Sequence, residues 1–215
     1  MNEYSFKSKT RRCAIKKRGR KKSPEKRRNI TQAAITVFSR VGYHKARIKD
    51  IAKISGVAEG TIYIYFKNKE DLLISIFKEK TRETIEFFKS EVQKEATPLD
   101  KLKRLISLHL ETFEKEKDLA RLYQLELRQS VRLTKEYFKV EHKEYLDLMG
   151  EIIKEGKEQG VFRKDINESI VKRVIFGAVD EVITTWVVSS KEYDLTSVYE
   201  PLTDVLLKGL LNPEK

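Results

Sequence analysis

The sequence predicts an all-α protein with an N-terminal three-helix domain, of the helix-turn-helix type, and a C-terminal helical bundle. Three observations favour this fold class. Apolar residues recur at helical spacing through most of the 215 residues. No segment alternates apolar and polar residues between turn-forming residues, so we expect no sheet. The glycine of Ser55-Gly56 separates two short helical patterns, which is typical of the sharp turn between paired helices.

Charge divides the chain into three parts. Residues 1–23 contain ten Lys and Arg against one acidic residue, residues 24–70 contain ten against four, and residues 71–215 contain 25 against 28. The first part is too polar and too strongly charged to fold alone, so we expect a disordered basic arm. A basic first third on a slightly acidic remainder favours a polyanion, such as DNA, as the partner of the N-terminal region.

Part of this arm, Arg18-Gly19-Arg20 flanked by lysines, is similar to an AT-hook, which lies in the minor groove of A·T-rich DNA. Lys21 stands where that motif has proline, and a non-specific basic tail is the alternative. Either arm would add salt-dependent affinity for DNA, because each neutralised phosphate releases counterions.

The first helix is expected to begin at Ser23-Pro24, with serine as the N-cap, and to end before Gly42. Its inward stripe consists of Ile30, Ala33, Ala34, Val37 and Phe38.

Two shorter helices follow. The apolar face of the second helix is marked by Ile48, Ile51 and Ala52. On the third, Ile62 and Phe66 are four apart and would both face inward.

The outward side of the third helix carries the candidate DNA contacts. Gly60 and Thr61 are small enough for close approach of another surface, and tyrosine hydroxyls suit phosphate oxygens. The candidate DNA-binding residues are Arg47, Lys49, Glu59, Gly60, Thr61, Tyr63, Tyr65 and Lys69. The alternative is a helical hairpin inside a bundle, with both tyrosines partly buried.

A long helix is expected after the Asn68 cap, with Asp71 completing a variant capping box, and it would reach about Ala96. It would connect the DNA-binding part to the body as a rigid lever. The remaining helices are expected near residues 99–116, 118–128, 131–159, 167–189 and 196–211.

Spaced residues of the N-terminal part resemble the DNA-binding domain of the TetR family of transcriptional repressors, over about residues 25–72. They are Gly42-Tyr43, Asp50-Ile51-Ala52, Ser55-Gly56-Val57, Gly60-Thr61-Ile62-Tyr63, Tyr65-Phe66 and Lys69-Glu70-Asp71-Leu72. Arg47 stands where the family usually has a threonine that caps the second helix. We expect that cap to be lost or shifted, which would leave Arg47 free to reach DNA.

Residues 170–188 are the most apolar part of the body, and their apolar side chains cover more than one helix face. Such a helix must be buried on two sides. With the apolar last helix it suggests a four-helix interface in a homodimer, which would also hold two DNA-binding domains over successive major grooves. The alternative is that the two helices only close the core of a monomer.

Runs in the body are similar to the FadR-type branch of the TetR repressors. They are Leu125-Glu126-Leu127-Arg128-Gln129-Ser130, Ile175-Phe176-Gly177-Ala178-Val179-Asp180-Glu181, Thr184-Thr185-Trp186-Val187 and Tyr193-Asp194-Leu195. The resemblance implies a repressor of fatty-acid degradation genes that releases operator DNA on binding long-chain acyl-CoA. The alternative is a different hydrophobic effector, such as a drug-like or aromatic compound.

A long acyl chain would need an apolar tunnel, because each buried methylene contributes about 0.8 kcal/mol. The candidate wall residues are Leu105, Leu108, Phe113, Leu122, Leu125, Phe176, Val179 and Ile183. At the mouth, Arg128 and Gln129 are candidates for the phosphates and the pantetheine. Ordinary core packing is the alternative for each apolar residue, and an ion pair with Glu126, Asp180 or Glu181 is the alternative for Arg128.

Several functions are not expected. We find no Ser/His/Asp or Cys/His set, no phosphate-binding glycine loop and no metal-ligand spacing, so we expect neither an enzyme nor a metal or cofactor site. Cys13 is the only cysteine, so no intrachain disulfide can form. The absence of an apolar run of about 20 residues, or of a secretory signal, favours a cytoplasmic protein. An architectural DNA binder driven by the basic arm remains the alternative from another class.

We therefore expect a disordered arm over residues 1–23, a helix-turn-helix DNA-binding domain over 24–70, and a helical ligand-binding and dimerisation domain over 71–215.

Overall fold

The computed structural model describes residues 22–127 and 141–211. These residues form helices and connecting turns, and their one β-contact is an isolated antiparallel bridge between Phe162 and Leu211. The predicted all-α class is confirmed. The predicted disordered arm, apart from its last two residues, lies outside the described ranges.

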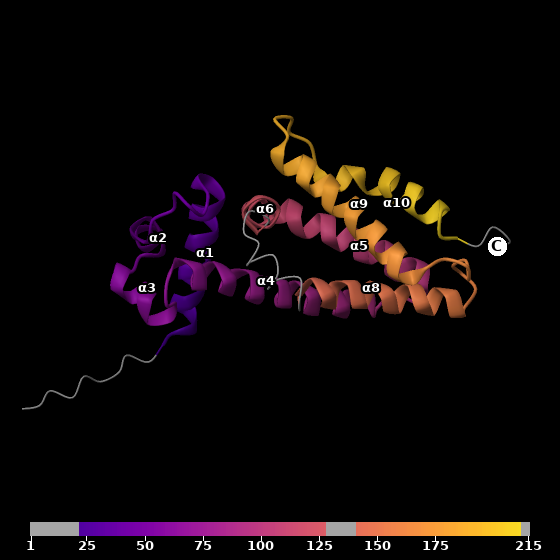
Figure 1. The fold of residues 1–215 in the computed structure, drawn as a ribbon, viewed down its shortest axis with the longest axis horizontal. Helices are drawn as coiled ribbons and strands as arrows, with labels where there is room; N and C mark the ends of the chain where they lie inside the picture. Colours follow the sequence, from indigo (N-terminus) through magenta and orange to yellow (C-terminus); the bar gives the residue numbers. More distant parts are fainter. Residues whose placement is uncertain (1–21, 128–140, 212–215) are drawn as a thin grey trace, which may run out of the picture.

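The N-terminal domain consists of α1 (Pro24–Val41), α2 (Ile48–Ser55) and α3 (Glu59–Tyr65), which gather at one end of the molecule (Figure 1). Local chemistry sets the ends of these helices. The hydroxyl of Ser23 accepts a hydrogen bond from the Lys26 amide at the start of α1. Gly42 and Gly56 have φ angles of 77° and 67°, a left-handed backbone that glycine adopts most easily.

The core of this domain is completed from the body. Phe38, Ile51, Ile62 and Phe66 are fully or almost fully buried in it. Three leucines of the following bundle belong to the same cluster: Leu119, Leu122 and Leu127. The packing therefore does not stop at residue 70, where the sequence placed the domain boundary.

The lever helix α4 (Lys69–Val92) runs from the N-terminal domain into the body (Figure 1). Asn68 caps it by accepting from the Asp71 amide, and the Asp71 carboxylate accepts from the Lys67 amide. The helix ends at Val92, earlier than expected, because the amides of Lys94 and Glu95 bond carbonyls three residues back and tighten the chain into turns.

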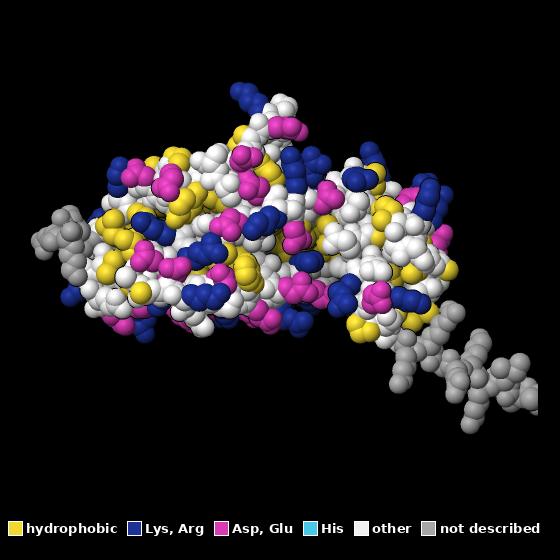
Figure 2. All heavy atoms as spheres, turned by 180° about the vertical axis from the view of Figure 1, so that it is seen from behind, with side chains coloured by type: hydrophobic (Ala, Val, Ile, Leu, Met, Phe, Trp, Pro, Cys, Tyr) yellow, Lys and Arg dark blue, Asp and Glu magenta, His cyan; other side chains and the backbone are white. Residues whose placement is uncertain are grey.

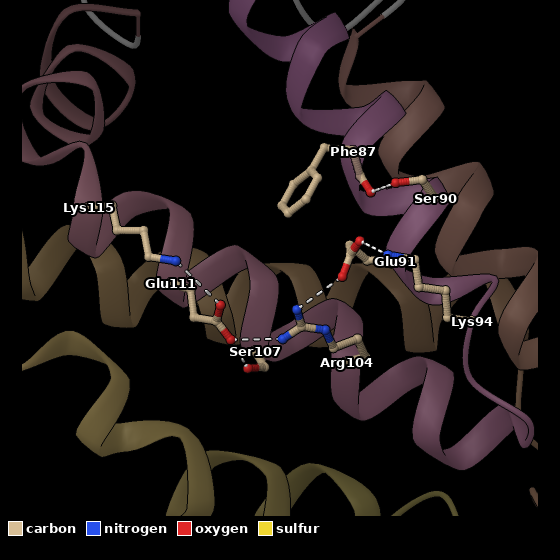
Figure 3. Close-up of polar contacts among 8 residues, drawn as sticks. All are labelled: Phe87, Ser90, Glu91, Lys94, Arg104, Ser107, Glu111 and Lys115. Carbon is tan, nitrogen blue, oxygen red and sulfur yellow. Dashed lines mark hydrogen bonds and ion pairs between the residues drawn. The ribbon is translucent and has the colours of Figure 1, made fainter.

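A salt bridge joins α4 to α5 (Pro98–Lys115) near the far end of the lever. The Arg104 guanidinium lies between the carboxylates of Glu91 on α4 and Glu111 on α5 (Figure 3). Phe87 projects from α4 above this cluster and is 48% exposed. The lever is thus tied to the body by charge as well as by its buried apolar face.

The body consists of α5, α6 (Lys117–Arg121), a π-helical turn η1 (Leu122–Glu126), α8 (Glu141–Glu158), α9 (Glu168–Val188), a 3-10 turn η3 (Leu195–Val198) and α10 (Tyr199–Lys208). The predicted single helix over 118–128 is wrong in detail, because a π turn interrupts it. The predicted helix over 196–211 divides into η3 and α10. The first ten residues of the expected helix 131–159 lie outside the described ranges.

One face of the molecule carries no large patch of a single charge (Figure 2). Lys and Arg side chains alternate there with Asp and Glu, and hydrophobic side chains show between them. None of the helices in the described ranges has the length and apolar character that a bilayer crossing requires.

Candidate functional site

The helix-turn-helix exposes one side of α3. Tyr63 is 53% exposed and Ile64 is 39% exposed, while the inward positions before and after them, Ile62 and Phe66, are buried. Glu59 and Gly60 are exposed at the start of the helix, and Thr61 is half-buried. Lys49 on α2 is also exposed. This face offers a phenol hydroxyl, a bare backbone at Gly60 and a cation, which are the groups that contact phosphates and base edges.

Tyr65 has a different role from the one predicted. Its hydroxyl accepts a hydrogen bond from the Ser23 amide at 2.8 Å, and its half-buried ring packs against the domain core. The residue therefore braces the start of α1. Helix periodicity did not predict this contact 42 residues away, and the prediction that the hydroxyl also contacts DNA stays a prediction.

Lys69 is also committed within the fold. Its ammonium donates to the carbonyl oxygens of Tyr43, His44 and Ala46, at 2.7, 3.3 and 3.0 Å. An ammonium has three donors, so these bonds use all of them. Lys69 closes the α1–α2 loop, and the prediction that it contacts DNA needs correction.

At Arg47 the predicted loss of the helix cap is confirmed, since no side chain caps α2. The residue is not free, however, because its Nε donates to the Asp50 carboxylate at 2.8 Å. This hydrogen bond lowers the pKa of Asp50 below its usual value. Arg47 remains exposed, and an exposed pair of this kind contributes little stability, so DNA could compete for the guanidinium.

The body contains a pocket with about 800 Å³ of space unfilled by protein atoms, part of it open to solvent. Its lining residues come from α4, α5, α6, η1, α8 and α9. They are Thr81, Thr84, Ile85, Phe88, His109, Thr112, Phe113, Leu119, Tyr123, Gln124, Leu127, Tyr145, Phe176 and Asp180. The largely apolar lining with a few polar groups matches that of small-molecule sites.

The structure brings two of the predicted wall residues, Phe113 and Phe176, to this pocket. Five others pack in the hydrophobic cores without lining it: Leu105, Leu108, Leu122, Val179 and Ile183. Leu125 is 38% exposed, because the wider π turn rotates the register of the segment. These six residues do not line this pocket, so their contact with an acyl chain stays a prediction, and Arg128 and Gln129 lie outside the described ranges.

The sequence-based prediction of the wall did not include the α4 residues, although their spacing along the helix indicates a common face. Thr81, Thr84, Ile85 and Phe88 follow the i, i+3, i+4, i+7 spacing of one helix face. Two of them are threonines, so an apolar stripe alone does not reveal the face.

Polar groups meet inside this apolar pocket. His109 Nδ1 and the Tyr145 hydroxyl are 2.9 Å apart, and burial lowers the pKa of His109 to about 4, so the imidazole is neutral at pH 7. Gln124 donates to the Asp180 carboxylate at 2.9 Å and accepts from the Thr184 hydroxyl at 2.8 Å. In the described ranges no three His, Cys, Asp or Glu side chains are grouped as metal ligands would be.

The pocket and the helix-turn-helix domain share one segment. Tyr123 and Gln124 of η1 line the pocket, while Glu126, two residues later, accepts a hydrogen bond from the Tyr43 amide at 3.0 Å. Leu119 and Leu127 line the pocket and also pack in the core of the N-terminal domain. A displacement of this segment by a ligand would therefore reach the α1–α2 loop directly.

Two family models match the chain. Residues 30–76 match the model described as bacterial regulatory proteins, tetR family, and residues 77–209 match the C-terminal region of YsiA-like proteins.

Among characterised proteins, the fatty acid metabolism regulator protein of Bacillus subtilis strain 168 is 39% identical over 183 residues, covering 85% of this chain and 94% of the relative. The solved structure of the fatty acid degradation regulator FadR from Bacillus halodurans superposes with a TM-score of 0.83 at 41% identity, over 88% of this chain and 97% of that one. The FadR of Bacillus subtilis, solved in complex with stearoyl-CoA, gives 0.80 at 38% identity, over 85% and 98%.

Proposed function

Since the chain belongs to the TetR family of bacterial regulatory proteins, we propose that it is a dimeric repressor of fatty-acid degradation genes and that long-chain acyl-CoA releases it from operator DNA. The relatives are regulators, and the proposed role needs no catalytic step and no cofactor. Its place of action is the cytoplasm, where operator DNA lies.

Recognition of DNA is assigned to the exposed side of α3. Tyr63 supplies a hydroxyl for phosphate, Ile64 supplies an apolar surface for a thymine methyl group, and Gly60 lets the backbone come close. Lys49 and Arg47 flank this face with positive charge. Glu59 and Thr61 complete it at the N-terminal turn of the helix.

A dimer is supported by apolar side chains that the single chain leaves uncovered on α9 and α10. Ile170, Val174 and Val188 on α9 are 58%, 56% and 60% exposed, and Val205 on α10 is 71% exposed. The two helices pack together in the body, so these side chains can form one surface. Pairing that surface with its own copy is the symmetric way to bury it.

The effector is assigned to the pocket between the lever and the body. Its rings and aliphatic groups suit an acyl chain, and it is open to solvent on one side. A relative at 38% identity was solved with stearoyl-CoA, which supports the same class of ligand here. The phosphates and adenosine of the ligand would remain nearer the solvent.

One observation carries the proposed response: α6 and η1 contact the pocket on one side and the helix-turn-helix domain on the other. Effector binding favours the form of the dimer whose pocket accommodates the ligand. If the Tyr43 loop moves in that form, the two reading helices lose their spacing on the operator. The response is then a population shift between two forms of the dimer.

The test is fluorescence anisotropy on a labelled inverted-repeat operator, obtained by selection from random DNA with the full chain. Stearoyl-CoA should weaken operator binding by roughly 5- to 150-fold, the usual range of coupling between sites. Coenzyme A without an acyl chain should leave it unchanged. Unchanged operator affinity at saturating stearoyl-CoA would rule out this effector.

A second candidate effector is an aromatic or drug-like compound. Five aromatic rings line the pocket: Phe88, Phe113, Tyr123, Tyr145 and Phe176. Such rings stack with flat ligands as well as packing around an acyl chain. Competition between acyl-CoA and aromatic compounds in a thermal-shift assay separates the two.

A further inference from the structure

His109 is the polar centre of an aromatic cluster in the pocket wall. Its side chain lines the pocket and the residue is only 8% exposed. Ring centroids of Phe113 and Tyr145 lie 5.3 and 5.1 Å from the imidazole centroid, and those of Phe88 and Phe176 both lie at 6.2 Å. A polar ring in such surroundings needs hydrogen-bond partners to offset the cost of its burial.

One of its two nitrogens has a partner. Nδ1 lies 2.9 Å from the Tyr145 hydroxyl. A phenol is a better donor than a neutral imidazole N–H, so we assign the hydroxyl as the donor to Nδ1 and place the ring proton on Nε2. Across residues 22–127 and 141–211, the hydrogen bond formed by the His109 imidazole is this one to Tyr145, through Nδ1. The neutral ring thus offers one N–H donor at the pocket.

We infer that His109 is a ligand-binding residue, whose Nε2–H donates a hydrogen bond to the thioester carbonyl oxygen of the bound acyl-CoA. This inference rests on the proposed function. The acyl chain has no acceptor beyond its carbonyl, and the phosphates are too strongly hydrated to enter a cluster of five rings. The carbonyl is therefore the group of this ligand that matches a neutral donor in an apolar wall.

The inferred bond has a consequence for selectivity. A carbonyl held at His109 fixes the head of the acyl chain, so the space beyond it determines which chain lengths fit. Tyr145 acts as a positioning residue, because its hydroxyl holds the proton of the imidazole on the nitrogen that faces the ligand. Chain-length preference would then depend on where the carbonyl is fixed as well as on the total volume of the pocket.

The experiment compares stearoyl-CoA with S-octadecyl-CoA, the thioether that lacks only the carbonyl oxygen. Calorimetric titration of the full-length protein should show roughly five- to tenfold tighter binding of the thioester, the contribution of one hydrogen bond. His109→Phe keeps a ring of similar size and should abolish this preference. His109→Gln, which keeps an N–H near the position of Nε2, should retain part of it.

His142→Phe is the matched control. His142 is also a buried histidine, with its ring centroid 4.5 Å from that of Phe176, but it does not line the pocket. This variant should keep the thioester preference. Nitrogen-15 NMR of the wild-type imidazoles gives a reading without mutation: the Nε2–H resonance of His109 should shift more with the thioester than with the thioether.

Each outcome decides something. Equal binding of the two ligands to the wild type would overturn the role of His109 and leave the proposed effector standing. A preference that persists in His109→Phe would do the same. If neither ligand binds the wild type, the acyl-CoA effector itself is wrong and the inference is overturned with it.

Discussion

Two tyrosines only two positions apart on α3 have different environments. Tyr63 is exposed, whereas the hydroxyl of Tyr65 accepts from the Ser23 amide. Removing the Tyr63 hydroxyl should therefore affect DNA, and removing the Tyr65 hydroxyl should affect the fold.

We expect Tyr63→Phe to weaken operator binding by roughly five- to tenfold and to leave the free energy of unfolding within about 0.5 kcal/mol of the wild type. Tyr65→Phe should lower the free energy of unfolding by about 1 kcal/mol, because the Ser23 amide loses its acceptor. Urea denaturation and operator titration on both variants measure the two effects. The reverse pattern would show that the assignment of the two residues is mistaken.

The ammonium of Lys69 supports a loop that contacts the body. Lys69→Met keeps the aliphatic stem beside the Tyr43 ring but leaves three carbonyl oxygens without their donor. We expect a loss of about 1–3 kcal/mol in the free energy of unfolding. Lys67→Met is the matched control, since Lys67 is exposed. Equal stabilities of the two variants in urea would contradict this role for Lys69.

Sequence reasoning succeeds at the residue scale where the partner is near in the chain. The caps at Ser23 and Asn68 were expected from residue type, and each accepts a hydrogen bond from the amide three residues ahead. The bonds of Tyr65 and Lys69 within the fold were not predicted, because their partners lie 42 and 23 to 26 residues away. Such contacts depend on how helices pack, which periodicity does not specify.

At the scale of the elements, the π turn η1 is the feature that the sequence did not predict. Residues 118–128 read as one continuous helix, and a π turn differs from an α turn by one inserted residue. That insertion sends Tyr123 and Gln124 to the pocket while Glu126 reaches the Tyr43 amide. The same register explains why Leu125 faces outward.

We expect Glu126→Ala to uncouple the pocket from the DNA-binding domain. Stearoyl-CoA should bind this variant within about twofold of the wild type, but its effect on operator affinity should fall by roughly 0.5–2 kcal/mol of coupling free energy. Anisotropy titrations with and without stearoyl-CoA give the coupling. Glu158→Ala, a change on the exposed face of α8, should behave as the wild type. An unaltered response in Glu126→Ala would show that the signal takes another route.

At the scale of the whole molecule, the sequence indicated an all-α chain with a basic N-terminal part and a very apolar C-terminal pair of helices. The fold followed from that pattern, because helix periods and caps are local. The pocket did not, because its wall combines six elements whose relative rotation is fixed only by packing. Hence two of the predicted wall residues, Phe113 and Phe176, reach the pocket, while their neighbours along α5 and α9 pack in the core.

The proposed dimer predicts that a charge on the uncovered surface dissociates it. Val205→Glu and Val174→Glu should each convert the protein to a monomer at micromolar concentration, because an unpaired carboxylate would be buried in the interface. Light scattering after size-exclusion chromatography measures the mass. Phe87→Glu changes an exposed apolar residue on the lever helix and should leave the dimer intact. Dimers of all three variants would place the interface elsewhere.

The central claim is that the pocket and the reading helices are coupled through one segment of the chain. Coupling between two binding sites is reciprocal, so operator DNA must change the affinity for stearoyl-CoA by the factor by which stearoyl-CoA changes the affinity for operator. The direct measurement is a calorimetric titration of stearoyl-CoA into the full-length protein, free and saturated with operator. We predict weaker binding to the operator complex, by that same factor; equal affinity in the two titrations would contradict the coupling.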